Sequence, residues 1–242
     1  MHHPLLKALM PILFLLTTHV QAVVFDFQEL TDTANGAISG EWADGTSFGP
    51  ANSGERAFNY FDWTQSGITL TASASYAGTG TYSDSYGTAY SEGDDLKAWA
   101  YLDQGHAGLG VCSLGLKSDG KGSNQCNPGG DDNVTINEIL QITFDQDVSI
   151  DFTQTDFRNA GHTLFDPTLF ISLDSGSTWS LMDPSATLIS DRFFFKTMDN
   201  HNQFYIDALS VVAQPSEVSE PNAFALFALT LAIFSLRRKR GA

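Results

Sequence analysis

A run of oxygen-bearing side chains is the first group in this 242-residue sequence whose residue types could do chemistry. Asp131, Asp132 and Asn133 are consecutive, and carboxylate and amide oxygens are the ligands that Ca²⁺ takes in proteins. Their spacing does not follow the EF-hand loop. The run therefore predicts either a calcium site of another kind or a solvated turn.

Side chains spaced for catalysis are scarce. The sequence contains no His-Glu-x-x-His, no Cys-x-x-Cys and no phosphate-binding glycine loop. His106, His162 and His201 lie far apart along the chain. We therefore expect a non-catalytic protein. Two of its many acids could still meet in the fold, so a glycan hydrolase with paired carboxylates is the alternative.

Two aromatic rings alternate with small residues in the run 96–103. On a strand, Trp99 and Tyr101 share one face while Ala98 and Ala100 share the other. If the aromatic face meets solvent, it is a platform on which the sugar rings of a glycan could stack. The opposite arrangement buries both rings and exposes the alanines.

Residues 172–179 read Ser-Leu-Asp-Ser-Gly-Ser-Thr-Trp, which resembles the Asp-box of sialidase-like propellers. The resemblance implies a structural hairpin formed by Ser172, Asp174, Gly176 and Trp179. An Asp side chain accepts bonds from nearby backbone N–H groups, and Gly allows a positive φ. The same residues contain Asp-Ser-Gly-Ser, which is similar to the aspartic-protease motif. A single copy of that motif would require a symmetric dimer, so the hairpin is favoured.

Cys112 and Cys126 are the only two cysteines in the chain, and a Gly-, Ser- and Asn-rich stretch separates them. In an exported protein, one pairing is available to them. We predict a disulfide, and two free buried thiols are the alternative.

Period-two alternation of apolar and polar residues dominates the body of the chain. It is clear around Ile68–Ala74, Leu140–Phe144, Val148–Phe152 and Leu169–Leu173. Residues 145–147 separate two of these runs and indicate a tight connection. Between 204 and 211, Phe204 and Ile206 have one parity and Leu209 and Val211 the other, and a bulge near Asp207 would reconcile them. We expect an all-β fold, a single antiparallel β-sandwich of jelly-roll type over 23–213. A smaller sandwich with a glycine-rich insert at 72–93 is the alternative.

The first 22 residues have the features of a secretory signal. Lys7 precedes an apolar run, and small residues end at Ala22, where we expect signal peptidase to cleave. The rest of the chain would then reach an oxidising compartment. The net charge of −16 argues against nucleic acid as a partner, because phosphate binding requires cations.

The C-terminal region consists of a linker at 214–221 and an apolar segment with a basic end at 222–242. Glu220 and Pro221 precede an uncharged apolar run, and Arg237, Arg238, Lys239 and Arg240 follow it. This arrangement resembles the PEP-CTERM sorting signal, although Ser219 stands where that family has its first proline. The apolar run predicts a short transmembrane helix with its basic end in the cytoplasm.

The resemblance implies an exosortase-type processing enzyme as a partner and a Gram-negative cell surface or extracellular matrix as the destination. Residues 108–144 also resemble a segment that recurs in uncharacterised exported bacterial domains carrying this kind of tail. We therefore expect a non-catalytic surface or matrix protein that binds extracellular polysaccharide. An adhesive structural protein that uses the tyrosine-bearing segment 72–93 is a further alternative, as is a tail that remains a permanent membrane anchor.

Overall fold

The computed structural model describes residues 22–32, 36–51, 54–77, 82–83, 89–90, 98–113, 126 and 132–215. The strands are β1 (Ala22–Asp26), β2 (Ile38–Trp42), β3 (Ser47–Ala51), β4 (Arg56–Gln65), β5 (Ile68–Tyr76), β6 (Tyr82–Ser83), β7 (Ala89–Tyr90), β8 (Trp99–Asp103), β9 (Gly108–Cys112), β10 (Glu138–Ile150), β11 (Asp156–Arg158), β12 (Phe170–Ser172), β13 (Ser180–Leu181), β14 (Leu188–Lys196) and β15 (Tyr205–Ala213). The helices are α1 (Phe27–Asp32) and the two 3₁₀ turns η1 (Phe152–Gln154) and η2 (Asn200–Asn202). The fold is all-β, as the alternation in the sequence predicts.

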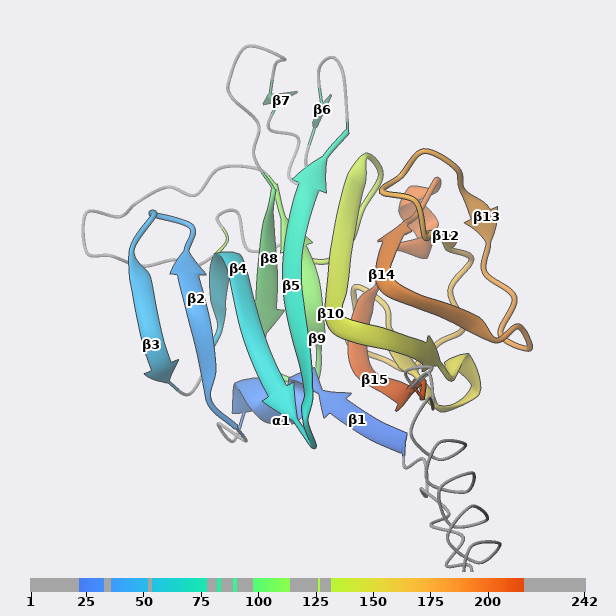
Figure 1. Cartoon of the computed structure of the whole chain (residues 1–242). Coiled ribbons are helices and arrows are strands. Elements are labelled where there is room, and N and C mark those ends of the chain that lie inside the picture. The colour runs from blue at the N-terminus through green and yellow to red at the C-terminus, as the bar shows by residue number, and fades with distance from the viewer. Residues whose placement is uncertain are drawn as a thin grey trace, which may run out of the picture.

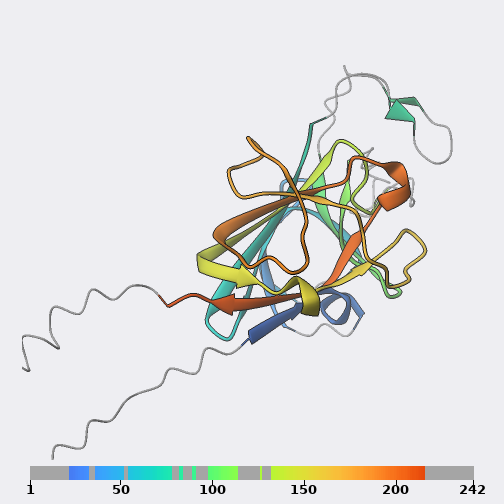
Figure 2. The ribbon, with the colours of Figure 1, turned by 90° about the vertical axis from the view of Figure 1, so that its right-hand side faces the viewer.

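Six strands of the main sheet close on themselves. The order β15-β9-β8-β4-β5-β10 returns to β15, and every neighbouring pair in this ring is antiparallel. Figures 1 and 2 show the strands wrapped around a common interior. The jelly-roll sandwich expected from the sequence is therefore replaced by a barrel, because one thirteen-stranded sheet curls round instead of forming two separate sheets.

A bend in β10 closes the barrel. The first half of β10 pairs with β5, and its second half, from Val148 to Ile150, pairs with β15. Between the halves, the register with β14 shifts from Thr143↔Arg192 to Val148↔Ser190, so β10 carries extra residues there. The expected tight connection at 145–147 is wrong: these residues form a bulge within one strand, and bulges bend strands.

The other strands of the main sheet extend the barrel wall (Figure 1), while β6 and β7 form a separate two-stranded sheet. β2 and β3 add to β4, while β14, β12 and β13 add to β10. β1 and β11 both pair with β15. The register of β11 with β15 steps from Asp156↔Ala208 to Phe157↔Ile206, which leaves Asp207 as an extra residue. The bulge predicted near Asp207 is thus confirmed.

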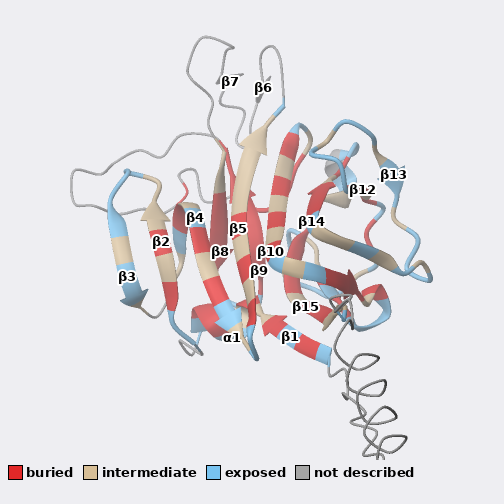
Figure 3. Cartoon of the chain, in the orientation of Figure 1, coloured by how far each residue is buried: buried red, intermediate tan, exposed pale blue. Residues whose placement is uncertain are grey.

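The core fills the barrel interior with aromatic and branched side chains. Phe25, Phe61, Trp63, Phe193 and Phe195 are among the side chains with almost no exposed surface. Along β4 and β10, buried positions alternate with more exposed ones, as Figure 3 shows. One face of β4 and of β10 therefore packs inward, and much of the other face is left for solvent or a partner.

Helix α1 lies at one end of the barrel (Figure 1). The Asp26 carboxylate accepts a bond from the Glu29 N–H at 2.7 Å, which satisfies a free donor in the first helical turn. Phe27 and Leu30 are fully buried in the main core. The helix packs against β8, β9 and β15, so it covers this end of the core.

A second, smaller core lies outside the ring. It contains Ala57, Tyr101, Cys112 and Cys126, with Trp99 packed against it. The predicted disulfide between Cys112 and Cys126 is confirmed, with their Cα atoms 5.8 Å apart. It covers the outer face of β8, so both faces of that strand are buried.

The termini lie largely outside this description. The structure begins at Ala22, already paired with Val212 in β1, and ends at residue 215. Residues 1–21 of the expected signal peptide, for which we predict a helix, the sorting motif and the apolar segment 222–242 are outside the described residues. Among the residues described, no helix is both long and apolar enough to cross a membrane.

Candidate functional site

A row of polar side chains crosses four strands on the outer face of the sheet. Glu41 on β2 lies opposite Tyr60 on β4, Tyr60 opposite Ser73 on β5, and Ser73 opposite Gln141 on β10. Directly opposed residues in an antiparallel pair share one face. The inward neighbours of Tyr60 and Gln141, such as Phe61 and Leu140, are buried.

A second, parallel row runs beside the first. It consists of Ser39, Asp62, Thr71, Thr143 and Arg192, which are opposed in register from β2 through β4, β5 and β10 to β14. Five strands spaced by ~4.8 Å make the row roughly 19 Å long. We call the two rows together the polar sheet face.

Hydrogen bonds hold the polar sheet face in place. The Thr71 hydroxyl donates to Asp62 Oδ1 at 2.5 Å, and Gln141 Nε2 donates to the Ser75 hydroxyl at 2.6 Å. The Ser73 hydroxyl donates weakly to Gln141 Oε1 at 3.5 Å. Hydroxyl and amide groups bound in this way keep further donor or acceptor positions. The face therefore presents ordered donors and acceptors instead of mobile side chains.

Tyr60 is the exposed aromatic residue of this face. Its side chain is 39% exposed, although it lies in the middle of a long strand. A phenol ring offers an apolar surface together with a polar hydroxyl. Arg192 supplies the cation of the face, and it is paired with Asp191, whose Oδ1 lies 3.0 Å from Arg192 Nε.

A second group of chemically active side chains lies near the turn between β8 and β9. Asp103, at the end of β8, is buried, and its Oδ2 lies 3.2 Å from His162 Nε2. The Tyr205 hydroxyl donates to Asp132 Oδ1 at 2.5 Å. The His162 ring packs edge-on against Tyr205, with ring centroids 5.5 Å apart. We call these four residues the acid–histidine cluster.

The geometry of His162 determines how the cluster holds its proton. Nδ1 lies 2.9 Å from the Gly105 carbonyl oxygen, which can only accept, so Nδ1 carries a hydrogen. A neutral ring then has a lone pair on Nε2, facing Asp103. The pair is therefore bonded only when Asp103 and His162 share one further proton.

Burial makes that proton hard to remove. Desolvation, followed by the negative charge of Asp132, raises the pKa of Asp103 to about 7. The pKa of Asp132 is also raised by burial, while its bond from Tyr205 opposes the increase. Burial and both carboxylates raise the pKa of Tyr205 as well, so the phenol stays neutral and donates. Sequence patterns do not predict that these four residues lie together, because they come from four separate segments of the chain.

The hairpin predicted at 172–179 connects β12 to β13. Asp174 accepts from the Thr178 N–H at 2.9 Å and from the Thr178 and Ser172 hydroxyls at 2.7 and 2.6 Å. These bonds lower the pKa of Asp174 to about 2, with the Ser172 bond contributing most. Gly176 has φ +82° and lies against the Trp179 ring. Both carboxylate oxygens of Asp174 are occupied within the turn.

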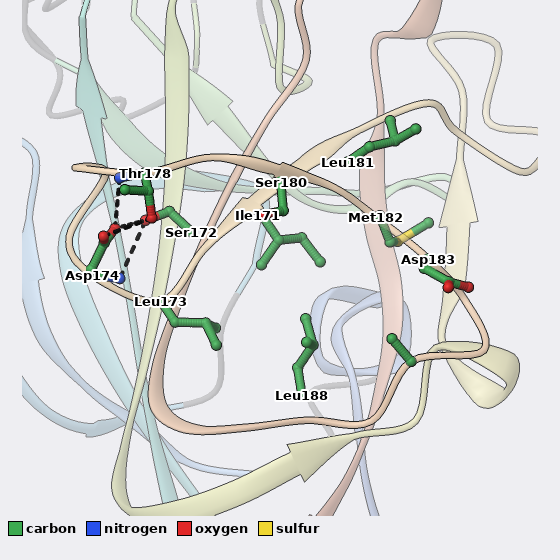
Figure 4. A pocket seen from close by; sticks show the side chains of 11 residues that line it. Ile171, Ser172, Leu173, Asp174, Thr178, Ser180, Leu181, Met182, Asp183 and Leu188 are labelled. Carbon is green, nitrogen blue, oxygen red and sulfur yellow. Dashed lines mark hydrogen bonds between the residues drawn. The ribbon is translucent and has the colours of Figure 1, made fainter.

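A pocket of about 420 Å³ lies beside this hairpin. Figure 4 shows Ile171, Leu173 and Leu188 around its centre, with Asp174 at one side and Asp183 at the other. Leu181, on the edge strand β13, also lines it and is 59% exposed. The volume is in the range of small-molecule sites.

The aromatic platform predicted from Trp99 and Tyr101 is wrong. Tyr101 is only 1% exposed, and Trp99 is half-buried beside it. The disulfide of the second core covers this face, and the Tyr101 hydroxyl donates to Glu55 at 3.0 Å. The alternative, which buried both rings and exposed the alanines, is right about Tyr101 but wrong about Ala100, which packs into the main core.

The predicted calcium ligands do not converge in the part of the chain that is described. Asp131 lies outside the described residues. Asp132 binds Tyr205, while Asn133 is buried and its Nδ2 donates to Gln203 at 3.2 Å. Across the described residues, no group of three or more His, Cys, Asp or Glu side chains could hold a metal ion.

One motif in the sequence resembles a hydrolase nucleophile. Residues 45–49 read Gly-Thr-Ser-Phe-Gly, the Gly-x-Ser-x-Gly pattern. That chemistry needs the serine on a sharp turn from a strand into a helix. Ser47 instead begins β3, directly after the turn from β2, and the described residues between it and β4 include no helix. The match is therefore a hairpin sequence and not a nucleophile.

Comparison with known proteins finds no matching family model, no matching curated protein and no matching solved structure. The class of protein is therefore defined by the fold and its surfaces. The chain is an all-β barrel protein with one disulfide and an ordered polar face.

Proposed function

We propose that this chain is a non-catalytic, exported surface or matrix protein that associates with extracellular polysaccharide through the polar sheet face. The observation that carries the proposal is the register of the two rows, which places hydroxyl, amide and carboxylate groups across five strands beside the exposed Tyr60 ring. Trp99 and Tyr101 have no part in it.

The chemistry of the face suits a glycan. Sugar hydroxyls both donate and accept hydrogen bonds, and the face offers Gln141 and the Ser and Thr hydroxyls, which do the same. The apolar side of a sugar ring can rest on Tyr60. Each bond contributes only about 0.5–1.5 kcal/mol, so a chain that contacts a row of groups binds better than a single sugar.

The negative charge of the protein bears on which kind of polysaccharide it can bind. The protein carries a net charge of −16, and Glu41 and Asp62 lie on the polar sheet face itself. An acidic polysaccharide would be repelled at low ionic strength. We therefore expect a neutral polysaccharide, or an acidic one only when a divalent cation bridges the charges.

Export is the second part of the proposal. The disulfide supports an oxidising compartment. We propose that signal peptidase removes residues 1–22, that segment 222–242 holds an intermediate in the membrane, and that an exosortase-type enzyme cuts near Glu220 and Pro221. Intact-mass analysis of the extracellular protein tests this sequence of events. Peptides that contain Phe224 in the released product would contradict it.

Co-sedimentation with the polysaccharide of the source organism tests the binding. Tyr60→Ala and Gln141→Ala should each reduce the retained fraction at least threefold, with or without Ca²⁺. Met198→Ala is the matched control, because Met198 is 60% exposed and is not part of the polar sheet face. Equal retention of all four proteins, or no retention of the wild type, would contradict the proposal.

The acid–histidine cluster supports a second candidate, a glycan hydrolase with paired carboxylates. Asp103, with a pKa of about 7, has the protonation expected of a general acid, and Asp132 is the nearby second carboxyl. Reducing-end release from polysaccharides by the full chain is the test. Activity that is lost in both Asp103→Asn and Asp132→Asn, with unchanged melting temperatures, would replace the binding proposal with this one.

A further inference from the structure

Two turns that are ordered by internal hydrogen bonds flank the pocket between the β12–β13 hairpin and the segment leading into β14. Ser172 and Thr178 both donate to Asp174, and the Gly176 N–H donates to the Ser172 hydroxyl at 2.9 Å. On the other side, Asp183 accepts from the Ser185 N–H and hydroxyl at 2.9 and 2.7 Å. Both turns are therefore fixed before a ligand arrives, which lowers the cost of binding.

The lining of the pocket is mainly apolar. Ile171, Leu173, Met182 and Leu188 surround its centre, and Leu181 stands at its edge. Leu181 is 59% and Leu173 37% exposed, so both have apolar surface that a ligand would remove from water. The pocket volume of about 420 Å³ is within the range of sites that hold small organic ligands.

The charges of the pocket have one sign. Asp174 and Asp183 lie at opposite sides of it, as Figure 4 shows, and none of the described residues that line it is Lys or Arg. Hydrogen bonds within the two turns keep both carboxylates ionised. A ligand in this pocket would contact apolar side chains that lie between two negatively charged carboxylates.

We propose that this pocket binds a small organic cation with an apolar body, such as an alkylammonium group. The apolar body would lie against Leu181, Leu173 and Met182, and the positive charge would remain near the mouth, between Asp174 and Asp183. Nothing in this site depends on the polar sheet face, so the proposal stands apart from polysaccharide association.

Isothermal titration calorimetry of the full chain with octyltrimethylammonium, below its micelle concentration, tests the proposal. Binding should be saturable with one site, should show a negative heat-capacity change, and should weaken as salt is added. Octyl sulfate, which has the same body and the opposite charge, should bind at least tenfold more weakly. Tetramethylammonium, which lacks the body, should also bind at least tenfold more weakly.

Leu181→Lys places a positive charge at the mouth and should weaken octyltrimethylammonium binding at least tenfold. Ile189→Lys is the matched control, because Ile189 is 52% exposed and does not line the pocket. Asp183→Asn should weaken the cation severalfold and leave octanol binding unchanged. Equal affinity for the cation and octyl sulfate, equal effects of the two lysine variants, or no saturable binding would overturn the proposal.

Discussion

Raising the pH from 5 to 8 should destabilise the protein through Asp103. The folded state holds the proton of this carboxyl with a pKa of about 7, whereas the ordinary value of 3.8 applies when the chain is unfolded. The folded state binds this proton more tightly than the unfolded state does, so the resulting stabilisation of the folded state is complete at low pH. It is lost as the pH rises through the interval from about 4 to about 7.

The size of the effect follows from the two pKa values. One pKa unit corresponds to about 1.4 kcal/mol, and most of the interval of three units is crossed between pH 5 and pH 8. The free energy of unfolding should therefore fall by about 2–3 kcal/mol over that range. At pH 8 the ionised Asp103 is held in a desolvated site, and this burial, followed by the nearby charge of Asp132, is the physical origin of the loss.

Asp103→Asn is the decisive variant. The Asn amide can donate to His162 Nε2 as a protonated carboxyl does, and it cannot ionise. Urea unfolding at pH 5, 6, 7 and 8 should show a smaller loss of stability in Asp103→Asn than in the wild type, by about 2–3 kcal/mol across the range. Asp166→Asn, which removes a charge from an exposed site, should retain the wild-type slope. A slope in Asp103→Asn equal to that of the wild type would refute the reasoning.

Three further outcomes are expected. Replacing Cys112 and Cys126 together by Ala should lower the free energy of unfolding by roughly 3 kcal/mol, as measured in urea, and a stability equal to the wild type would contradict this. Gly108→Ala should cost roughly 3 kcal/mol or more, because its Cβ would lie 2.4 Å from a backbone oxygen of β15 at φ +115°, whereas Gly49→Ala has open space and should be tolerated. Asp174→Asn should lower the melting temperature and speed proteolysis within the hairpin, and unchanged cleavage would show that the Asp174 bonds are dispensable.

Local patterns in the sequence were sufficient to predict the strands. Ile68, Leu70 and Ala72 alternate with Thr69, Thr71 and Ser73, and the structure buries the first set and turns the second set outward. Strand neighbours do not follow from such patterns. The register that aligns Thr71 with its partners on four other strands is set by the whole barrel.

Residues 145–147 show where local reasoning failed. A polar break between two apolar runs is typical of a turn, and here it is a bulge at which β10 passes from pairing with β5 to pairing with β15. The prediction that Tyr101 forms an exposed platform was wrong for a related reason. Alternation indicates which residues share a face, but it does not show that the predicted disulfide lies over the outer face of β8 and covers Tyr101.

The acid–histidine cluster could not be predicted because its members are far apart in the chain. In the sequence, 58 residues lie between Asp103 and His162, and the two meet through a loop that packs onto the β8–β9 turn. His162 itself has φ +58°, a conformation that sequence patterns do not specify for histidine.

Footprinting of the protein on its polysaccharide tests the central proposal most directly. Hydroxyl-radical labelling of the full chain, with and without the purified polysaccharide, reports the exposure of each side chain. We predict that Tyr60 becomes protected in the complex, while the exposed Met198, which is not part of the polar sheet face, is labelled equally in both states. Unchanged labelling of Tyr60 in a sample that is fully bound to the polysaccharide would contradict the assignment of the polar sheet face as the binding surface.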